Sequence, residues 1–249
     1  MSDFKDILVG TVGYPVRNKN FLRDIDVLEM DDAKYIPPGR KAAVKIHESL
    51  GEDLKTVVQI SRYFVNTPKD GITLKGKIEN YGNFQLTDES LKLWERQIEF
   101  AKGLNASAMV LITPPNVTPS FKTVTAMGDF LKKVDRAGMD IVWEPHGPWE
   151  REYIEKFAAD YNLILAVDPL RDPVPEGKLV YFRLGAFAAG GSRMGVYDLE
   201  QIAAAALESE ADKIFCLFET QRALDDAKNL KQTLLSVMDG DDDFDEFDY

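Results

Sequence analysis

The sequence of 249 residues has a single cysteine, Cys216, and only two histidines, His47 and His146. One cysteine excludes an internal disulfide and a cysteine-based zinc site. Two histidines exclude a three-histidine metal centre. No apolar run approaches the ~18 residues that a membrane helix needs, and the polar N-terminus lacks the apolar core of a signal peptide. These absences predict a cytoplasmic protein without contact to a membrane.

Basic residues are outnumbered by acidic ones, 30 against 42, which gives a formal net charge of −12. Phosphate binding normally needs a basic face, so nucleic acid is not the favoured partner. Seven of the acids fall in the last eleven residues, 239–249, which leaves −5 for residues 1–238. The body of the protein is therefore only mildly acidic.

Short apolar runs recur along the chain, and segments of helical periodicity follow most of them. The runs are apolar on consecutive residues, which is typical of strands buried on both faces of a parallel sheet. The eight runs span residues 7–9, 25–30, 56–60, 108–112, 139–143, 163–167, 179–182 and 214–218. The helical segments span residues 38–50, 88–103, 120–138, 149–161, 198–209 and 221–238. This alternation predicts an α/β fold, a (β/α)8 TIM-type barrel forming one domain over residues 1–238. An open doubly wound sheet is the alternative.

Two segments outside this alternation stand out. The connection 62–86 is long and carries Arg62, Lys69, Lys75 and Lys77. A loop of this length is a lid, a binding loop or a solvated connection, and its basic part, 62–77, could contact nucleic acid. Residues 239–249 combine acids with the aromatics Phe244, Phe247 and Tyr249. We expect this tail to be disordered in isolation and to dock on a protein partner through its aromatics, or to act only as a solubilising tail.

Active residues of such a barrel lie at the carboxyl ends of its strands. Glu29 and Glu144 follow apolar runs and could act as acid and base or ligate a hard divalent metal ion. His146 is the one histidine placed for catalysis, two residues after Glu144. We predict these three as catalytic residues and Asp168, before a proline, as a turn residue. Arg183, with the glycine-rich segment 185–195, could bind an anion.

Motifs at these strand ends resemble those of the YecE-like proteins, also called domain of unknown function 72 (DUF72). The similar elements include Gly10-Thr11-Val12-Gly13-Tyr14, Glu29 to Asp31 with the following Tyr35, Thr113-Pro114-Pro115, Glu144 to Trp149, and Tyr181 to Leu184. The resemblance covers residues 7–234 and implies a TIM-type barrel in a diverged, archaeal-type member, without a settled activity. It points to Thr11, Tyr14, Tyr35, Trp149 and Arg183 as residues that bind a substrate or an anion.

The chain also departs from the family pattern. Gln59 stands where the family often has a lysine, Asn66 where it has a histidine, and Ile112 where it has a glutamine. A pocket that has lost these groups together does different chemistry from its relatives, or none.

Three hypotheses on function follow. The first is a hydrolase or phosphoester-processing enzyme with an acidic pocket at the barrel mouth, acting on a small or phosphate-containing ligand. The second is a non-catalytic adaptor that recruits a partner through residues 239–249. The third is a nucleic-acid-binding protein that uses the loop 62–77.

Overall fold

The computed structural model describes residues 5–15, 19–69, 74–185 and 194–239. The strands follow one another around a closed barrel in sequence order, which confirms the predicted (β/α)8 fold class. The strands are β1 (Asp6–Val12), β2 (Val27–Met30), β3 (Lys55–Gln59), β4 (Ala108–Thr113), β5 (Asp140–Pro145), β6 (Ile164–Val167), β7 (Leu179–Leu184) and β8 (Lys213–Phe218). The helices are α1 (Arg40–Leu50), α2 (Asp88–Gly103), α3 (Phe121–Lys133), α4 (Arg151–Asp160), α5 (Val196–Glu208) and α6 (Ala223–Asp239).

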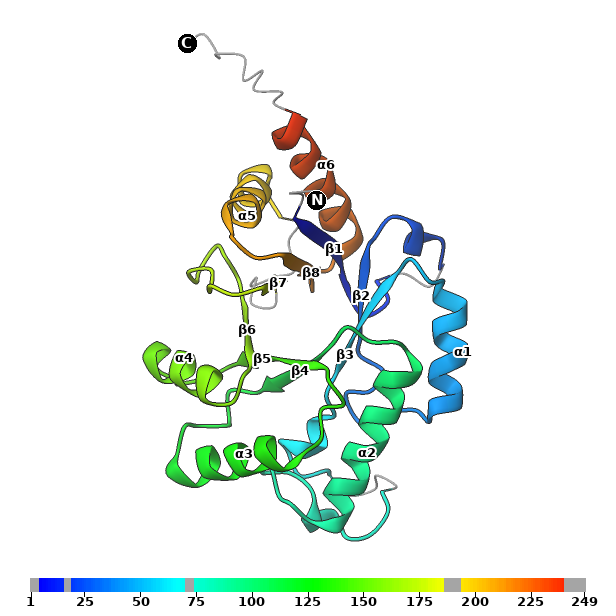
Figure 1. The fold of residues 1–249 in the computed structure, drawn as a ribbon, viewed down its shortest axis with the longest axis vertical. Coiled ribbons are helices and arrows are strands. Elements are labelled where there is room, and N and C mark those ends of the chain that lie inside the picture. Colours follow the sequence, from blue (N-terminus) through cyan, green and yellow to red (C-terminus); the bar gives the residue numbers. More distant parts are fainter. Residues whose placement is uncertain (1–4, 16–18, 70–73, 186–193, 240–249) are drawn as a thin grey trace. The chain divides into compact units, whose positions relative to one another are not determined.

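The chain forms two compact units, and the larger one is Asp26–Ala166. Within it β2, β3, β4, β5 and β6 pair in parallel, each with the next. Helices α1 and α2 lie side by side (Figure 1). Its aromatic core brings Phe130 to 5.4 Å from Trp94 and to 5.2 Å from Phe64, measured between ring centroids. Burial of such large side chains contributes the main stabilising term of this unit.

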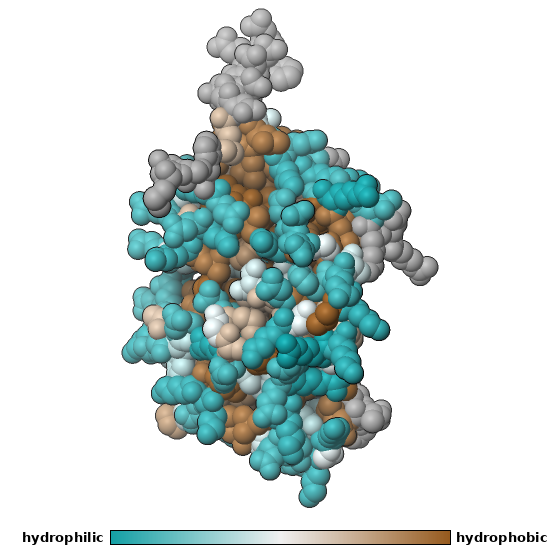
Figure 2. Space-filling view, turned by 45° about the vertical axis from the view of Figure 1, so that its right-hand side comes forward, coloured by the Kyte–Doolittle hydropathy of each residue, from teal (hydrophilic) through white to brown (hydrophobic). Residues whose placement is uncertain are grey.

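The other unit joins Met1–Ile25 to Val167–Tyr249. Here β8 pairs in parallel with both β7 and β1, and α6 packs on β1, β8 and α5. Cys216 lies on β8 with none of its surface exposed, and burial raises the pKa of its thiol. Apolar surface gathers at the top of Figure 2 over α6, whose residues Leu235, Val237 and Met238 are each more than half exposed.

The predicted helix 88–103 has the expected bounds, because the Thr87 hydroxyl accepts a hydrogen bond of 3.2 Å from the Ser90 amide and caps its first turn. The helix predicted over 120–138 instead ends at Lys133. The Asp135 carboxylate accepts a hydrogen bond of 2.8 Å from the Ala137 amide, and Ala137 has a φ of 52°. This local bond competes with the helical hydrogen bonds and turns the chain toward β5.

The long connection between β3 and α2 is more ordered than its sequence indicates in the part that the structure describes. It contains the 3-10 helices Arg62–Phe64 and Ile78–Asn80. The returning chain pairs with the first of these: the amides of Gly82, Asn83 and Phe84 donate to Tyr63, Val65 and Phe64, at 2.7, 2.8 and 2.7 Å. Asn83 and Phe84 both have positive φ, 50° and 55°. A bulky residue in this region is strained and must be held by its surroundings.

Candidate functional site

The register of the larger unit decides which strand-end side chains share a face. Residues at one level of the ladder are Glu29 on β2, Val57 on β3, Ala108 on β4 and Asp140 on β5. Side chains alternate between the two faces along a strand. Gln59, two residues beyond Val57, and Glu144, four beyond Asp140, therefore lie on the same face as Glu29. Trp143 lies on the opposite face, where it packs against Phe157 of α4. The predicted acids thus line the side of the sheet that the helices do not cover.

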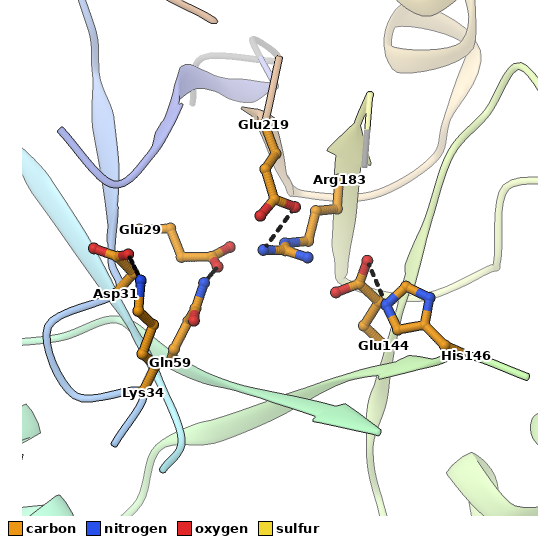
Figure 3. Close-up of polar contacts among 8 residues, drawn as sticks. All are labelled: Glu29, Asp31, Lys34, Gln59, Glu144, His146, Arg183 and Glu219. Carbon is orange, nitrogen blue, oxygen red and sulfur yellow. Dashed lines mark hydrogen bonds and ion pairs between the residues drawn. The ribbon is translucent and has the colours of Figure 1, made fainter. Parts of the chain in front are cut away.

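Glu29 and Gln59 form a buried pair (Figure 3). The Gln59 Nε2 donates to Glu29 Oε1 at 2.6 Å, and the two residues are 3% and 0% exposed. A hydrogen bond to a carboxylate is stronger than one between neutral groups. Gln59, noted in the sequence only as a departure from the family pattern, therefore fixes the predicted catalytic residue Glu29.

Gln97 of α2 holds the backbone of Gln59 and Ser61 in place through hydrogen bonds. Its carboxamide oxygen accepts a hydrogen bond of 3.1 Å from the Ser61 amide, and its Nε2 donates to the Gln59 carbonyl at 3.2 Å. It is fully buried. The sequence carried a signal for it that was missed: Gln97 is a polar residue on the apolar stripe formed by Trp94, Ile98 and Ala101. It sets the position of the chain where β3 ends.

Glu144 and His146 lie together at the end of β5 (Figure 3). The His146 Nε2 is 3.4 Å from Glu144 Oε1, and the two side chains are only 12% and 7% exposed. The His146 amide donates to the Thr113 carbonyl at 2.9 Å, which ties this strand end to that of β4. The two predicted catalytic residues, two apart in the sequence, are therefore neighbours in the structure, and their catalytic role stays a prediction.

The other predicted residues of this unit have different surroundings. Tyr35 is 48% exposed, and the guanidinium of Arg62 lies 5.9 Å from its ring centre. Trp149 is buried, its ring 5.2 Å from that of Trp143, and its Nε1 donates to the Val117 carbonyl at 2.9 Å. Because this bond uses the single N–H of the indole, Trp149 has no donor left for a substrate and takes no part in the proposed proton transfer. The strand-end acid Asp31 forms an ion pair with Lys34 (Figure 3).

In the unit that contains β7, the Arg183 guanidinium and the Glu219 carboxylate form an ion pair of 3.1 Å (Figure 3). The Arg183 side chain is 3% exposed and that of Glu219 is 43% exposed. In the register, Arg183 is level with Leu217, and Leu217 with Gly10. Thr11 therefore lies on the opposite face, where its hydroxyl donates to the Gly13 carbonyl at 3.2 Å. Arg183 is thus a buried cation that forms an ion pair with the carboxylate of Glu219.

Two further predicted residues of this unit are accounted for locally. Tyr14 is 38% exposed and meets Phe21 edge to face, with ring centres 6.3 Å apart. Asp168 accepts a hydrogen bond of 3.1 Å from the Leu170 amide, so it is a turn residue as predicted. Burial raises the pKa of the Asp168 carboxyl.

Metal binding needs several ligands at one place. Across residues 5–15, 19–69, 74–185 and 194–239, no three His, Cys, Asp or Glu side chains gather in a way that could hold a metal ion. The divalent metal ion considered as a possible cofactor therefore has no such ligand set among these residues. The glycine-rich residues 186–193 and the tail aromatics Phe244, Phe247 and Tyr249 lie outside the described residues. The boundary at residue 238 and the docking role of the tail stay predictions.

The geometry defines a TIM-type barrel with ionisable residues at its strand ends, and solved structures share this fold. A DUF72 family protein from Enterococcus faecalis matches with a TM-score of 0.68 and 15% identity, covering 96% of this chain and 99% of that one. A DUF72 family protein from Thermotoga maritima matches with a TM-score of 0.66 and 15% identity, over 92% and 99%. A xylose isomerase domain containing protein from Salmonella typhimurium gives 0.54 and 15%, over 94% and 96%. The resemblance to DUF72 is thereby confirmed at the level of the fold.

Sequence comparisons add no further relative. No family model matches the chain, and no curated protein matches it. Among the described residues, no helix has the length and apolar character needed to span a membrane.

Proposed function

We propose that the protein is a hydrolase of phosphate esters in which Glu144 and His146 transfer the proton. The observation that carries the proposal is the 3.4 Å between His146 Nε2 and Glu144 Oε1, two side chains that are both largely buried at the end of β5. A histidine paired with a buried carboxylate is a common arrangement for a general base, because the carboxylate orients the ring and stabilises its protonated form.

The pairing assigns each nitrogen of the ring a task. Contact with the carboxylate favours the tautomer with its proton on Nε2, which leaves Nδ1 as the acceptor. In the proposed reaction, Nδ1 takes a proton from water while the water oxygen forms a bond to phosphorus. The bond from phosphorus to the ester oxygen breaks, and the leaving alcohol receives the proton from the imidazolium. Water and ester are thus converted to alcohol and phosphate without another reactant.

Glu29 supplies the second carboxylate of this face. Its position is fixed by Gln59 at 2.6 Å, and Gln59 is fixed through its backbone by Gln97. A carboxylate held in this way can accept a hydrogen bond from a substrate hydroxyl without reorganising. Arg183 remains a proposed anion-binding residue of its own unit, and the proton transfer does not require it.

Steady-state hydrolysis of p-nitrophenyl phosphate and bis-p-nitrophenyl phosphate by the purified full chain tests the proposal. Loss of a general base lowers kcat by about 100-fold or more, so we expect this effect for His146→Ala and a similar one for Glu144→Gln. Glu150→Gln is the matched control, because Glu150 precedes α4 and makes no side-chain capping bond. Turnover of neither ester above buffer, or equal rates for His146→Ala and the parent protein, would contradict the proposal.

The adaptor and nucleic-acid hypotheses are separate proposals with tests of their own. Deletion of residues 239–249 should abolish recovery of a protein partner without changing thermal stability, if the tail docks. Binding of single- or double-stranded probes that weakens with salt should depend on the loop 62–77, if that loop contacts nucleic acid. Neither has a described side-chain arrangement comparable to the Glu144–His146 pair in its favour.

A further inference from the structure

A groove of about 380 Å³ lies in the larger unit, outside the Glu144–His146 pair. It is formed by the connection after β3, the loop after β4 and the first turns of α3. Its polar lining includes Asn66, Thr67, Asn83, Asn116, Lys122 and Thr123. We propose that this groove binds the phosphoryl group of a phosphorylated small molecule.

The chemistry of the lining is one-sided. Among the residues that the structure describes, those around the groove offer carboxamides, hydroxyls and one ammonium group but no carboxylate. In a chain with 42 acids and 30 bases, a groove whose described lining carries no acid offers an anion a local surface without repulsion. A phosphoryl group presents several strong acceptor oxygens, which matches a lining of neutral donors around a single cation.

A hydrogen bond between two lining side chains orients their donors. The Asn116 Nδ2 donates to Asn66 Oδ1 at 3.3 Å. That bond occupies one lone pair of the Asn66 oxygen and fixes the orientation of its carboxamide, whose N–H groups are donors for a ligand. The arrangement turns one carboxamide of the groove into a donor toward an anion.

The start of α3 adds further positive potential. Ser120 accepts a hydrogen bond of 3.2 Å from the Thr123 amide and caps the helix. The first turn has no acidic residue, although acids are the side chains that such a position favours. Lys122 occupies this turn instead and lines the groove. A cation at the start of a helix opposes the helix dipole, and a bound anion would offset that cost.

The opposite wall of the groove is held in a strained conformation. Asn83 and Phe84, with φ of 50° and 55°, both line the groove. Their amides are bonded to the carbonyls of Val65 and Phe64 at 2.8 and 2.7 Å. Strain of this kind persists where the surrounding structure fixes it, and it is enriched at ligand sites. It gives the groove a preformed wall.

The groove is also joined to the strand end of the proposed proton transfer. The last residue of β4 is bonded to the end of β5, from the His146 amide to the Thr113 carbonyl at 2.9 Å. The loop that continues from β4 carries Asn116, and its Val117 carbonyl accepts from the Trp149 indole at 2.9 Å. A phosphorylated ligand held at α3 would therefore lie beside the loop that continues from the strand end to which His146 is bonded. Binding in the groove rests on its own lining and not on the proposed hydrolysis, and inorganic phosphate, which has no ester bond, measures it without turnover.

Calorimetric titration of the full chain with inorganic phosphate, glucose 6-phosphate, AMP and glucose tests the inference. We expect saturable binding of the phosphorylated probes and none of glucose. Tighter binding of glucose 6-phosphate than of AMP would assign the groove to sugar phosphates, and the reverse order to nucleotides. Because a hydrogen bond to a charged group is worth tenfold or more in affinity, Lys122→Gln should raise Kd by about tenfold.

Lys133→Gln is the matched control, since Lys133 is an exposed lysine in the last turn of the same helix. It should change Kd by less than about twofold, in keeping with the small effect of a distant exposed charge. Glu144→Gln should leave phosphate binding intact even where it abolishes hydrolysis, so failure of one proposal is distinguishable from failure of the other. Equal weakening by Lys122→Gln and Lys133→Gln, binding of glucose as tight as that of its phosphate, or no saturable binding would overturn the inference.

Discussion

The fully buried side chain of Gln97, in α2, binds the backbone of Gln59: its Nε2 donates to the Gln59 carbonyl at 3.2 Å. The same carboxamide accepts from the Ser61 amide. By binding two backbone groups inside the core, this glutamine links α2 to the end of β3; we call these two hydrogen bonds the Gln97 link. The end of β3, and with it the partner of Glu29, depends on this one side chain.

Replacing Gln97 with leucine should therefore be costly. The change leaves a buried amide and a buried carbonyl without their partner, and each such group costs about 1–3 kcal/mol. We expect Gln97→Leu to lower the free energy of unfolding by about 2 kcal/mol or more, measured by urea denaturation. Gln232→Leu, at an exposed position of α6, should change it by less than about 0.5 kcal/mol. Equal effects of the two changes on the free energy of unfolding would show that the Gln97 link does not stabilise the protein.

The Glu29–Gln59 pair predicts a specific pattern of substitution effects. Gln59→Leu removes the donor at 2.6 Å from a fully buried carboxylate and should cost about 2–3 kcal/mol. Gln59→Lys restores a donor and adds an opposite charge, so it should be tolerated better than leucine. Urea unfolding of both variants, alone and combined with Glu29→Gln, measures the coupling. Equal costs for lysine and leucine would contradict the pairing.

Gly128 in α3 should not tolerate a side chain. A Cβ at this position would lie 2.1 Å from the hydroxyl oxygen of Tyr161, and overpacking typically costs about 1–3 kcal/mol. Alanine is otherwise the better helix former by about 1 kcal/mol, which offsets part of this cost, so we expect Gly128→Ala to destabilise by up to about 2 kcal/mol. In a Tyr161→Ala background the clash is gone, and the same change should be neutral or stabilising. Persistent destabilisation there would reject the steric explanation.

Asp168 predicts a dependence of stability on pH. Burial raises its pKa above the ordinary 3.8, so the folded protein keeps the proton to higher pH than the unfolded chain does. Its contribution to stability is complete below the unfolded pKa and is lost as the pH rises through the folded pKa. In Asp168→Asn the side-chain oxygen can still accept from Leu170, but the ionisation is absent.

The free energy of unfolding of the parent protein, relative to Asp168→Asn, should therefore fall as the pH rises from about 4. Urea unfolding at a series of pH values measures this difference. Parallel pH profiles of the two proteins would contradict the raised pKa.

Much of the fold follows from patterns that the sequence states locally. The consecutive apolar runs marked all the strands, and Thr87 marked the start of α2 with its cap. The predicted end of α3 was wrong, because Asp135 forms a turn that cannot be recognised from the spacing of apolar residues. The proximity of Glu144 and His146 was predictable, because a single residue separates them in the sequence.

The rest of the site depends on contacts distant in sequence. Gln97 and Gln59 are separated by 38 residues, and Asn66 and Asn116 by 50. Neither partner can be found from the neighbouring sequence, and the groove that Asn66 and Asn116 line is assembled from connections whose conformation only the folded chain specifies. Trp149 shows the reverse case, in which a motif residue is explained by a backbone bond to Val117.

The burial of Cys216 makes its thiol a native probe of local unfolding at β8. Because its thiol has no exposed surface and its pKa is raised, a maleimide or disulfide reagent can modify it only when β8 leaves the sheet. There is no second cysteine in the sequence to confuse the signal. The rate of its modification under native conditions would therefore report how often this part of the barrel opens, without any engineered label.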